Sequence, residues 1–266
     1  MRESDFDEYF ALRRAGDYRA AYGVLARIIK DNPRWSRVGD LYVWCGELEL
    51  LLNDDIHRAL EYLERAGELG CRSTASYLRQ HGYVLWRLGE REKGIQELEQ
   101  CVELEPTIAN LRTLGEVLSQ EQDPRAFSVW QHLLEKDPRS SCAHAHVGRE
   151  MARSGDRGKA LLMIKRAEHL SPSVEDTIGI AGAYFELGEF QSAIEAYLEA
   201  DRLGYAFKGP LYAAVAECYF SIGDPETGQR YLRWAVRHDP EHDSVKSACE
   251  RHDVNSEHSN GHGYPQ

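Results

Sequence analysis

The sequence predicts an all-α fold, a solenoid of about seven helix-turn-helix repeats that ends in a short C-terminal capping helix. Three recurring features carry this prediction: two series of small residues and one series of prolines. The first series places a glycine or alanine every 33 residues, at Gly82, Gly115, Gly148 and Ala181. Self-similarity at a fixed period of this length is the sequence signature of a repeat architecture.

The second series of small residues follows the first at a near-constant distance, and prolines close successive units. The small residues are Ala21, Ala59, Gly94, Ala126, Ala160, Ala193 and Gly228. The prolines are Pro33, Pro106, Pro138, Pro172 and Pro240. Because proline cannot continue a helix, we expect it to end the second helix of each unit. Because helices approach most closely where their side chains are small, we expect the small residues at the crossing of the two helices.

Each unit is predicted to contain two helices joined by a glycine turn. Residues 181–187 and 194–203 place apolar side chains at intervals of three and four, as a helix with one buried face does. The turn signals are Ala15-Gly16-Asp17-Tyr18, Leu88-Gly89-Glu90, Ser154-Gly155-Asp156, Leu187-Gly188-Glu189-Phe190 and Ile222-Gly223-Asp224-Pro225. Glycine after a helix takes the left-handed conformation without steric cost, and the acidic residue suits the N-terminus of the next helix.

The segment 179–200, GIAGAYFELGEFQSAIEAYLEA, resembles a tetratricopeptide repeat. It has the small residue, the tyrosine, the G-[DE]-[YF] turn, the alanine, the aromatic residue and the second alanine of that family in order. The resemblance extends over about residues 3–240. It implies a right-handed solenoid of such repeats that binds a protein or peptide without a cofactor.

Four places depart from the repeat pattern. Tyr9 stands where a small residue is expected, and the turn Asn53-Asp54-Asp55-Ile56 is one residue long. The turn Glu121-Gln122-Asp123-Pro124 is predicted to be one residue short, and residues 203–210 form an insertion. Atypical units are expected at the ends and bends of repeat arrays.

Three regions are predicted: the tetratricopeptide repeat array over residues 1–240, a capping helix over 241–252 and a polar tail over 253–266. Val245 and Cys249 lie four residues apart in the capping helix, and we expect them to face Leu232 or Trp234. The tail is rich in Asn, Ser, Gly and His, a composition typical of disordered segments.

The composition excludes several functional classes. The 266 residues contain 32 Lys and Arg against 44 Asp and Glu, a net charge of −12, whereas nucleic acids and anionic membranes attract basic surfaces. The start MRESDFDEYF lacks the pattern of a signal peptide, and no stretch approaches the ~20 apolar residues of a membrane span. The six cysteines are scattered, as reduced core residues are. We expect a cytoplasmic protein.

No catalytic or metal-binding motif is present. The sequence contains no H-E-x-x-H, G-x-S-x-G or C-x-x-C pattern. His144 and His146 are two residues apart and so point to different sides of a helix, while Pro240 separates His238 from His242. A structural zinc site usually needs four well-placed ligands. We therefore expect no catalytic residue, no cofactor and no metal.

In the family that the chain resembles, the first helix of each repeat lines a concave groove. Helical spacing then gives eight candidate peptide-binding residues, Arg79, Tyr83, Trp86, Arg87, Arg112, His146, Arg149 and Arg153. They form a basic and aromatic stripe in an acidic protein, and the planar fork of arginine can bind a carboxylate through two hydrogen bonds. The stripe predicts an acidic peptide ligand. In the alternative interpretation, the arginines pair with Glu116 or other neighbours on a solvated face.

The leading hypothesis is therefore a non-catalytic scaffold or adaptor that holds a protein or peptide in the groove. Some members of the family bind a C-terminal carboxylate through lysine and asparagine, but Tyr83 and Thr113 stand where asparagines would be, so this mode is not supported. The alternative is a self-associating structural subunit, a homo-oligomer formed through one end of the array or through a convex patch around Phe127 and Trp130.

Overall fold

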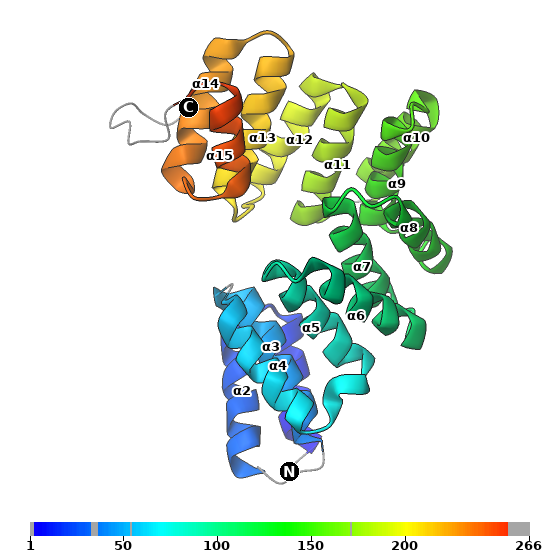
Figure 1. The fold of residues 1–266 in the computed structure, drawn as a ribbon, viewed down its shortest axis with the longest axis vertical. Helices are drawn as coiled ribbons and strands as arrows, with labels where there is room; N and C mark the ends of the chain where they lie inside the picture. The colour runs from blue at the N-terminus through cyan, green and yellow to red at the C-terminus, as the bar shows by residue number, and fades with distance from the viewer. Residues whose placement is uncertain (1–2, 33–36, 54, 171, 255–266) are drawn as a thin grey trace. The chain divides into compact units, whose positions relative to one another are not determined.

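The computed structural model describes residues 3–32, 37–53, 55–170 and 172–254. Within these ranges the chain forms α-helices and one short 3-10 helix, with no β-strand (Figure 1). The prediction of an all-helical repeat fold is confirmed. The helices fall into two compact units, Met1–Val129 and Trp130–Gln266, called unit 1 and unit 2 below.

The helices of unit 1 follow one another in pairs joined by short turns. They are α1 (Glu3–Arg14), α2 (Tyr18–Asp31), α3 (Val38–Asn53), α4 (Ile56–Glu68), α5 (Ala75–Arg87), α6 (Arg91–Leu104) and α7 (Ile108–Gln120), with the 3-10 helix at Cys71–Ser73. The helix α8 (Arg125–Lys136) contains the boundary between the units. Within unit 1, α1 packs on α2, α3 on α4 and α5 on α6, and each pair contacts the next.

Unit 2 continues the same pairing and ends in a single helix. Its helices are α9 (Ser141–Arg153), α10 (Arg157–His169), α11 (Val174–Leu187), α12 (Phe190–Arg202), α13 (Lys208–Ser221), α14 (Pro225–His238) and α15 (Asp243–Arg251). The pairs α9–α10, α11–α12 and α13–α14 each pack internally. Three packed pairs in each unit thus account for twelve of the described helices, and the single helix α15 follows the last pair.

Small residues lie where the two helices of a pair cross, as predicted. A Cβ atom on Gly82 of α5 would lie 2.8 Å from the carbonyl oxygen of Gly94 of α6, so these backbones are already in contact. A Cβ on Gly148 of α9 would lie 3.1 Å from the carbonyl oxygen of Ala160 of α10. All five alanines of the second series are completely buried, namely Ala21, Ala59, Ala126, Ala160 and Ala193.

Prolines follow the second helices of the pairs. Pro106 comes two residues after the end of α6, Pro138 two residues after α8 and Pro240 two residues after α14. Pro172 follows α10 at a slightly larger distance. The prediction holds at these four positions, whereas Pro33 lies outside the described residues.

Counted to the small residue of the second helix, the connection between α7 and α8 is one residue shorter than its counterparts, as predicted. The amide of Ala126 donates to the carbonyl three residues before it, whereas the amide of Gly94 donates to the carbonyl four residues before it. Gln122 takes the left-handed conformation with φ 56°, as Gly89 does with φ 90° in the α5–α6 turn. The amide of Asp123 donates to the carbonyl of Leu118 at 2.9 Å, matching the bond from Glu90 to the carbonyl five residues before it. Gln122 therefore occupies the position that glycine takes in the α5–α6 turn. The other irregular turn includes Asp54, which lies outside the described residues.

The first pair is held to the second by stacked aromatic rings. Tyr9 is completely buried, and its ring stacks on Trp44 of α3 with centroids 5.1 Å apart and planes 7° apart. Burial raises the pKa of the Tyr9 hydroxyl to about 12. The large residue at the small-residue position thus belongs to the core between α1 and α3.

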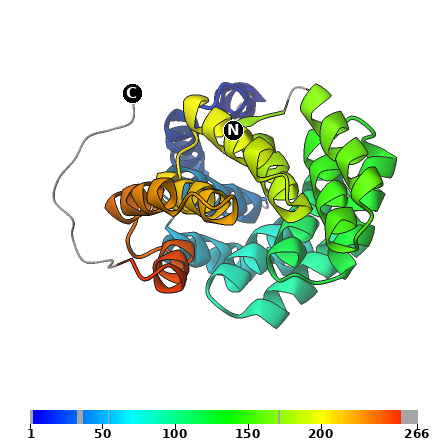
Figure 2. The ribbon, with the colours of Figure 1, turned by 90° about the horizontal axis from the view of Figure 1, so that it is seen from above.

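The last helix covers the end of the array. Val245 and Cys249 of α15 are buried in one cluster with Leu232, as predicted. The helix packs against both α13 and α14 (Figure 2). Glu217 of α13 accepts hydrogen bonds from Arg251 at 2.7 Å and is 3.1 Å from the Nε2 atom of His252. The predicted tail falls, from residue 255 onward, outside the described residues.

Candidate peptide-binding face

In unit 1, four candidate residues share one face of α5. The rings of Tyr83 and Trp86 lie 5.8 Å apart at their centroids, and the guanidinium carbon of Arg87 lies 5.9 Å from the Tyr83 centroid. Arg87 also donates from Nη1 to the Tyr83 hydroxyl at 3.3 Å. These side chains are partly exposed, as is Arg79 one turn earlier. The four side chains form a partly exposed aromatic and basic cluster, and their role in binding a peptide stays a prediction.

The indole nitrogen of Trp86 is hydrogen-bonded to another residue of unit 1. Its Nε1 donates to Glu121 Oε1 at 2.8 Å, and the other oxygen of Glu121 pairs with Arg91 at 3.4 Å. The ring is thereby fixed in orientation, since rotation would break the bond to Glu121. A fixed aromatic ring offers a ligand contact area at a low entropic cost.

Glu47 of α3 contacts two guanidiniums of unit 1. Arg13 of α1 donates to it at 2.6 Å, and Arg79 of α5 lies 3.6 Å from the same oxygen. The Glu47 side chain is largely buried, at 13% exposure. Two positive charges thus face one carboxylate, and Arg79 is the more loosely held of the two.

Arg112 of α7 pairs with Glu116 one turn further along the helix, at 3.9 Å. Both side chains are more than 40% exposed, so this pair is an ordinary solvated i,i+4 contact worth about 0.3–0.5 kcal/mol. The alternative that Arg112 pairs with Glu116 agrees with this contact.

In unit 2, Arg149 and Arg153 of α9 meet at Glu186 of α11. Arg153 Nη2 lies 2.6 Å and Arg149 Nη2 3.2 Å from Glu186 Oε1, and Arg153 also bonds Glu150 at 3.0 Å. Burial opposes ionisation of Glu186, but the two arginines outweigh it and hold its pKa below the ordinary value. Here, too, two guanidiniums share one carboxylate, and the structure brings two candidate residues together.

His146 of α9 serves the packing of unit 2. Its ring stacks on Trp130 of α8, with centroids 4.2 Å apart and planes 6° apart. Trp130 is completely buried. The predicted convex patch around Phe127 and Trp130 is therefore wrong, because the larger of its two side chains lies in the core rather than on the surface.

Glu47 and Glu186 were not identified from the sequence as the partners of the arginines. The available signal is spacing by one repeat. Arg13 and Glu47 are 34 residues apart, and Arg153 and Glu186 are 33 apart. Side chains at equivalent positions of successive first helices are neighbours in a repeat array, so a cation and an anion one period apart can pair.

In the described part of the chain, no group of three or more His, Cys, Asp or Glu side chains could hold a metal ion, and no helix is long and apolar enough to cross a membrane. The six cysteines are free and buried. Burial raises the pKa of Cys45 and of Cys218 to about 12, so these thiols are poor nucleophiles.

Comparison with known proteins identifies the repeat. Residues 75–108 and 178–203, which coincide with the α5–α6 pair and most of the α11–α12 pair, match the family model of the tetratricopeptide repeat. A tetratricopeptide repeat protein from Parabacteroides merdae is similar in structure, with a TM-score of 0.66, 16% identity and coverage of 94% of this chain and 98% of that chain. No curated protein sequence matches the chain.

Two further solved structures share the architecture. One is the APC/C hetero-tetramer Cut9–Hcn1, with a TM-score of 0.70, 15% identity and coverage of 92% of this chain but only 48% of the matched chain. The other is yeast Tom70, with a TM-score of 0.53, 13% identity and coverage of 89% of this chain and 58% of that chain. Two segments of the chain thus match the tetratricopeptide repeat, and the helical repeat fold is shared with these solved structures.

Proposed function

We propose that this protein is a non-catalytic scaffold or adaptor that binds a protein or peptide segment with acidic groups through the first helices of its repeats. The fold supports the general part of this proposal, because tetratricopeptide repeat proteins are generally interaction scaffolds. The residues proposed to contact the ligand are those named above on α5, α7 and α9: Arg79, Tyr83, Trp86, Arg87, Arg112, His146, Arg149 and Arg153.

The observation that carries the acidic preference is that two guanidiniums share one carboxylate oxygen in each unit, with Arg153 also bonded to Glu150 in unit 2. Arg13 and Arg79 share Glu47 in unit 1, and Arg149 and Arg153 share Glu186 in unit 2. A guanidinium has five donors, so one carboxylate oxygen does not saturate two of them. Each cluster can therefore accept a further carboxylate, and the fixed aromatic rings of α5 lie beside one of them.

A random peptide library displayed on phage and selected on the full chain tests the proposal. We expect the selected peptides to be rich in Asp and Glu beside apolar residues, and to lose binding to the double variant Arg112→Glu with Arg149→Glu. The matched control is Arg139→Glu with Arg233→Glu, which makes the same charge change at exposed positions outside the first helices. Equal loss with both double variants would refute the site, provided that circular dichroism shows both to be helical.

A self-associating structural subunit remains the second candidate. With Trp130 buried, such an assembly would use an end of the array, where Phe10 of α1 is 41% exposed beside Arg13 and Arg14. Light scattering on the eluting chain distinguishes the candidates. A mass that is a multiple of the chain and falls on Phe10→Ser would favour self-association.

A further inference from the structure

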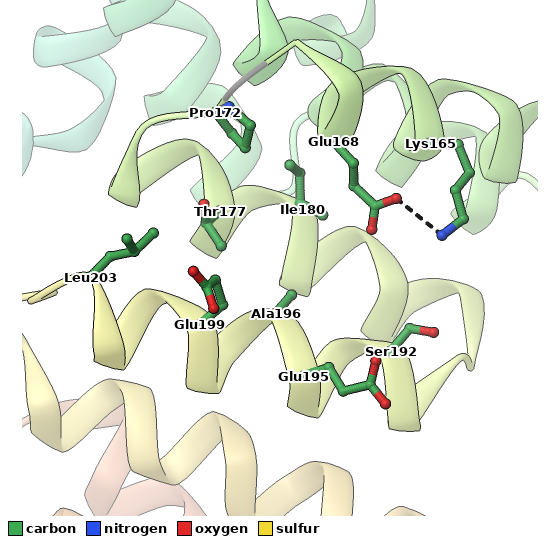
Figure 3. A pocket seen from close by; sticks show the side chains of 10 residues that line it. All are labelled: Lys165, Glu168, Pro172, Thr177, Ile180, Ser192, Glu195, Ala196, Glu199 and Leu203. Carbon is green, nitrogen blue, oxygen red and sulfur yellow. Dashed lines mark hydrogen bonds and ion pairs between the residues drawn. The ribbon is translucent and has the colours of Figure 1, made fainter.

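Unit 2 has a surface pocket of about 430 Å³ between α10, α11 and α12, and none of the candidate peptide-binding residues lines it (Figure 3). One face of α12 forms its long wall, because Ser192, Glu195, Ala196, Glu199 and Leu203 recur at intervals of three to four residues. At 1.5 Å per residue this wall extends over about 16 Å. We call this pocket the α12 groove.

The α12 groove has an apolar interior. Ile180 of α11 lies between α10 and α12 and faces Ala196 across the groove (Figure 3). Pro172 and Leu203 line one end, and the Leu203 side chain is 51% exposed. An exposed leucine that continues an apolar cavity is surface that a binding partner would remove from water.

The charges around this interior are mostly negative. Glu195 and Glu199 of α12 and Glu168 of α10 line the groove, against one cation, Lys165. Lys165 and Glu168 bond each other at 3.0 Å, and Glu168 also accepts from the Tyr184 hydroxyl at 2.8 Å. The charge of Glu168 is therefore already balanced by Lys165.

The excess charge lies on α12. The carboxylate of Glu195 accepts a hydrogen bond from the side-chain amide of Gln191 at 3.4 Å. Glu199 pairs with the exposed side chain of Arg202. Both neighbours belong to the same helix and lie within one turn, so neither spans the groove. The two carboxylates, one helical turn apart, border the apolar interior with acceptor capacity to spare.

We propose that the α12 groove binds a basic amphipathic helix of a partner protein. Two Lys or Arg side chains one turn apart on that helix have the same 5–6 Å spacing as Glu195 and Glu199. Their methylene stems would lie over the partly exposed Ala196 while the charged ends reach the carboxylates. An apolar side chain of the partner would contact Leu203. Charge complementarity selects this partner over an acidic one, and the net charge of −12 accelerates its encounter.

This inference stands apart from the proposed function, since the two surfaces share no residue and prefer ligands of opposite charge. The same phage library tests it after depletion on the groove-blocked variant Ala196→Trp. Ala196 is only partly buried, so the larger ring should fill the groove without entering the core. If this variant fails to fold, Glu195→Lys with Glu199→Lys replaces it in the depletion step.

We expect the peptides that survive depletion and then bind the parent chain to carry two basic residues at i,i+4 beside leucine or isoleucine. In fluorescence anisotropy, a selected peptide should bind Glu195→Gln with Glu199→Gln about tenfold more weakly. The matched control, Glu61→Gln with Glu64→Gln, removes two exposed carboxylates from α4 and should change the affinity less than twofold.

Three results would overturn the inference. Surviving peptides that are acidic or uncharged, or no survivors above the unselected library, would show that the groove does not select basic helices. If both pairs of glutamine substitutions weakened binding equally, the peptide would be held by general charge attraction and not by the groove. A parent chain that dimerises in sedimentation while Ala196→Trp stays monomeric would identify a second copy as the occupant. None of these results bears on Arg112 and Arg149, so the proposed function is tested separately.

Discussion

Replacing Gly94 by alanine should destabilise the α5–α6 pair, whereas the same substitution at Gly23 should stabilise α2. Both glycines lie inside helices, so alanine gains helix propensity of roughly 0.8–1.0 kcal/mol at either position. The surroundings of the added methyl group differ. A Cβ on Gly23 would meet nothing within 4 Å, so that gain is kept.

A Cβ on Gly94 would lie 2.5 Å from the carbonyl oxygen of Gly82 and 2.7 Å from the amide nitrogen of Trp86. Both atoms belong to the α5 backbone, so no side-chain rotation relieves the contact and the two helices must separate. Overpacking typically costs ~1–3 kcal/mol, and contact with two backbone atoms places this site at the upper end. After the propensity gain is subtracted, the net destabilisation should be about 2 kcal/mol.

Thermal melts followed by circular dichroism measure the difference. For a chain of this size, 1 kcal/mol shifts the Tm by about 2–4 °C. We therefore expect the Tm to fall by roughly 4–8 °C for Gly94→Ala and to rise by roughly 2–4 °C for Gly23→Ala. A Gly94→Ala variant that melts at or above the parent temperature would refute the close contact of α5 and α6. A rise at both sites would show that propensity alone is being measured.

The other predictions use the same melts and denaturant unfolding. Ala193→Leu places three extra carbons at a completely buried site and should cost about 1–3 kcal/mol; an unchanged melting curve would contradict that placement. Gln122→Gly removes the strain of a left-handed non-glycine residue and should stabilise by about 1 kcal/mol, so a loss of stability would count against the turn. Glu186→Gln should lower the free energy of unfolding at pH 7. Because the folded pKa of Glu186 lies below its ordinary value of 4.5, its contribution is complete above that value and is lost as the pH falls through the folded pKa. The gap between parent and variant should thus shrink from pH 7 to pH 3, and a gap that widens would contradict the sign of the shift.

The parts of the fold that follow from close backbone contact were predictable from the sequence. Gly82 and Gly94 approach so closely that no larger residue fits, and the recurrence of such sites discloses the repeat. The left-handed residue of the α7–α8 turn was not predictable, because that conformation favours glycine without requiring it. At Gln122 the hydrogen bonds of the turn outweigh the preference, and no local sequence signal records that balance.

The candidate site was predictable in position and less so in its electrostatics. Helical spacing identified the face of α5 because side chains four residues apart lie on one side of a helix. It did not show that Trp130 is in the core, since a tryptophan on a second helix fits either surface or interior. It also did not pair Glu47 or Glu186 with the arginines, because those contacts join residues 33 and 34 apart and depend on the stacking of successive repeats.

The pairing of the arginines with Glu47 and Glu186 limits the binding energy that an acidic ligand can gain. A carboxylate that approaches Arg79 competes with Glu47, and one that approaches Arg149 competes with Glu186, so binding cannot gain the full energy of a solvent-exposed arginine. The contacts are unequal, however. Arg13 and Arg153 hold their carboxylates at 2.6 Å, whereas Arg79 and Arg149 lie 3.6 and 3.2 Å away. Because these two contacts are longer, the least interaction energy is lost when a ligand replaces them. Arg79 and Arg149 are therefore the residues at which charge reversal should weaken an acidic ligand most, while reversal of Arg13 or Arg153 should chiefly reduce the stability of its own unit.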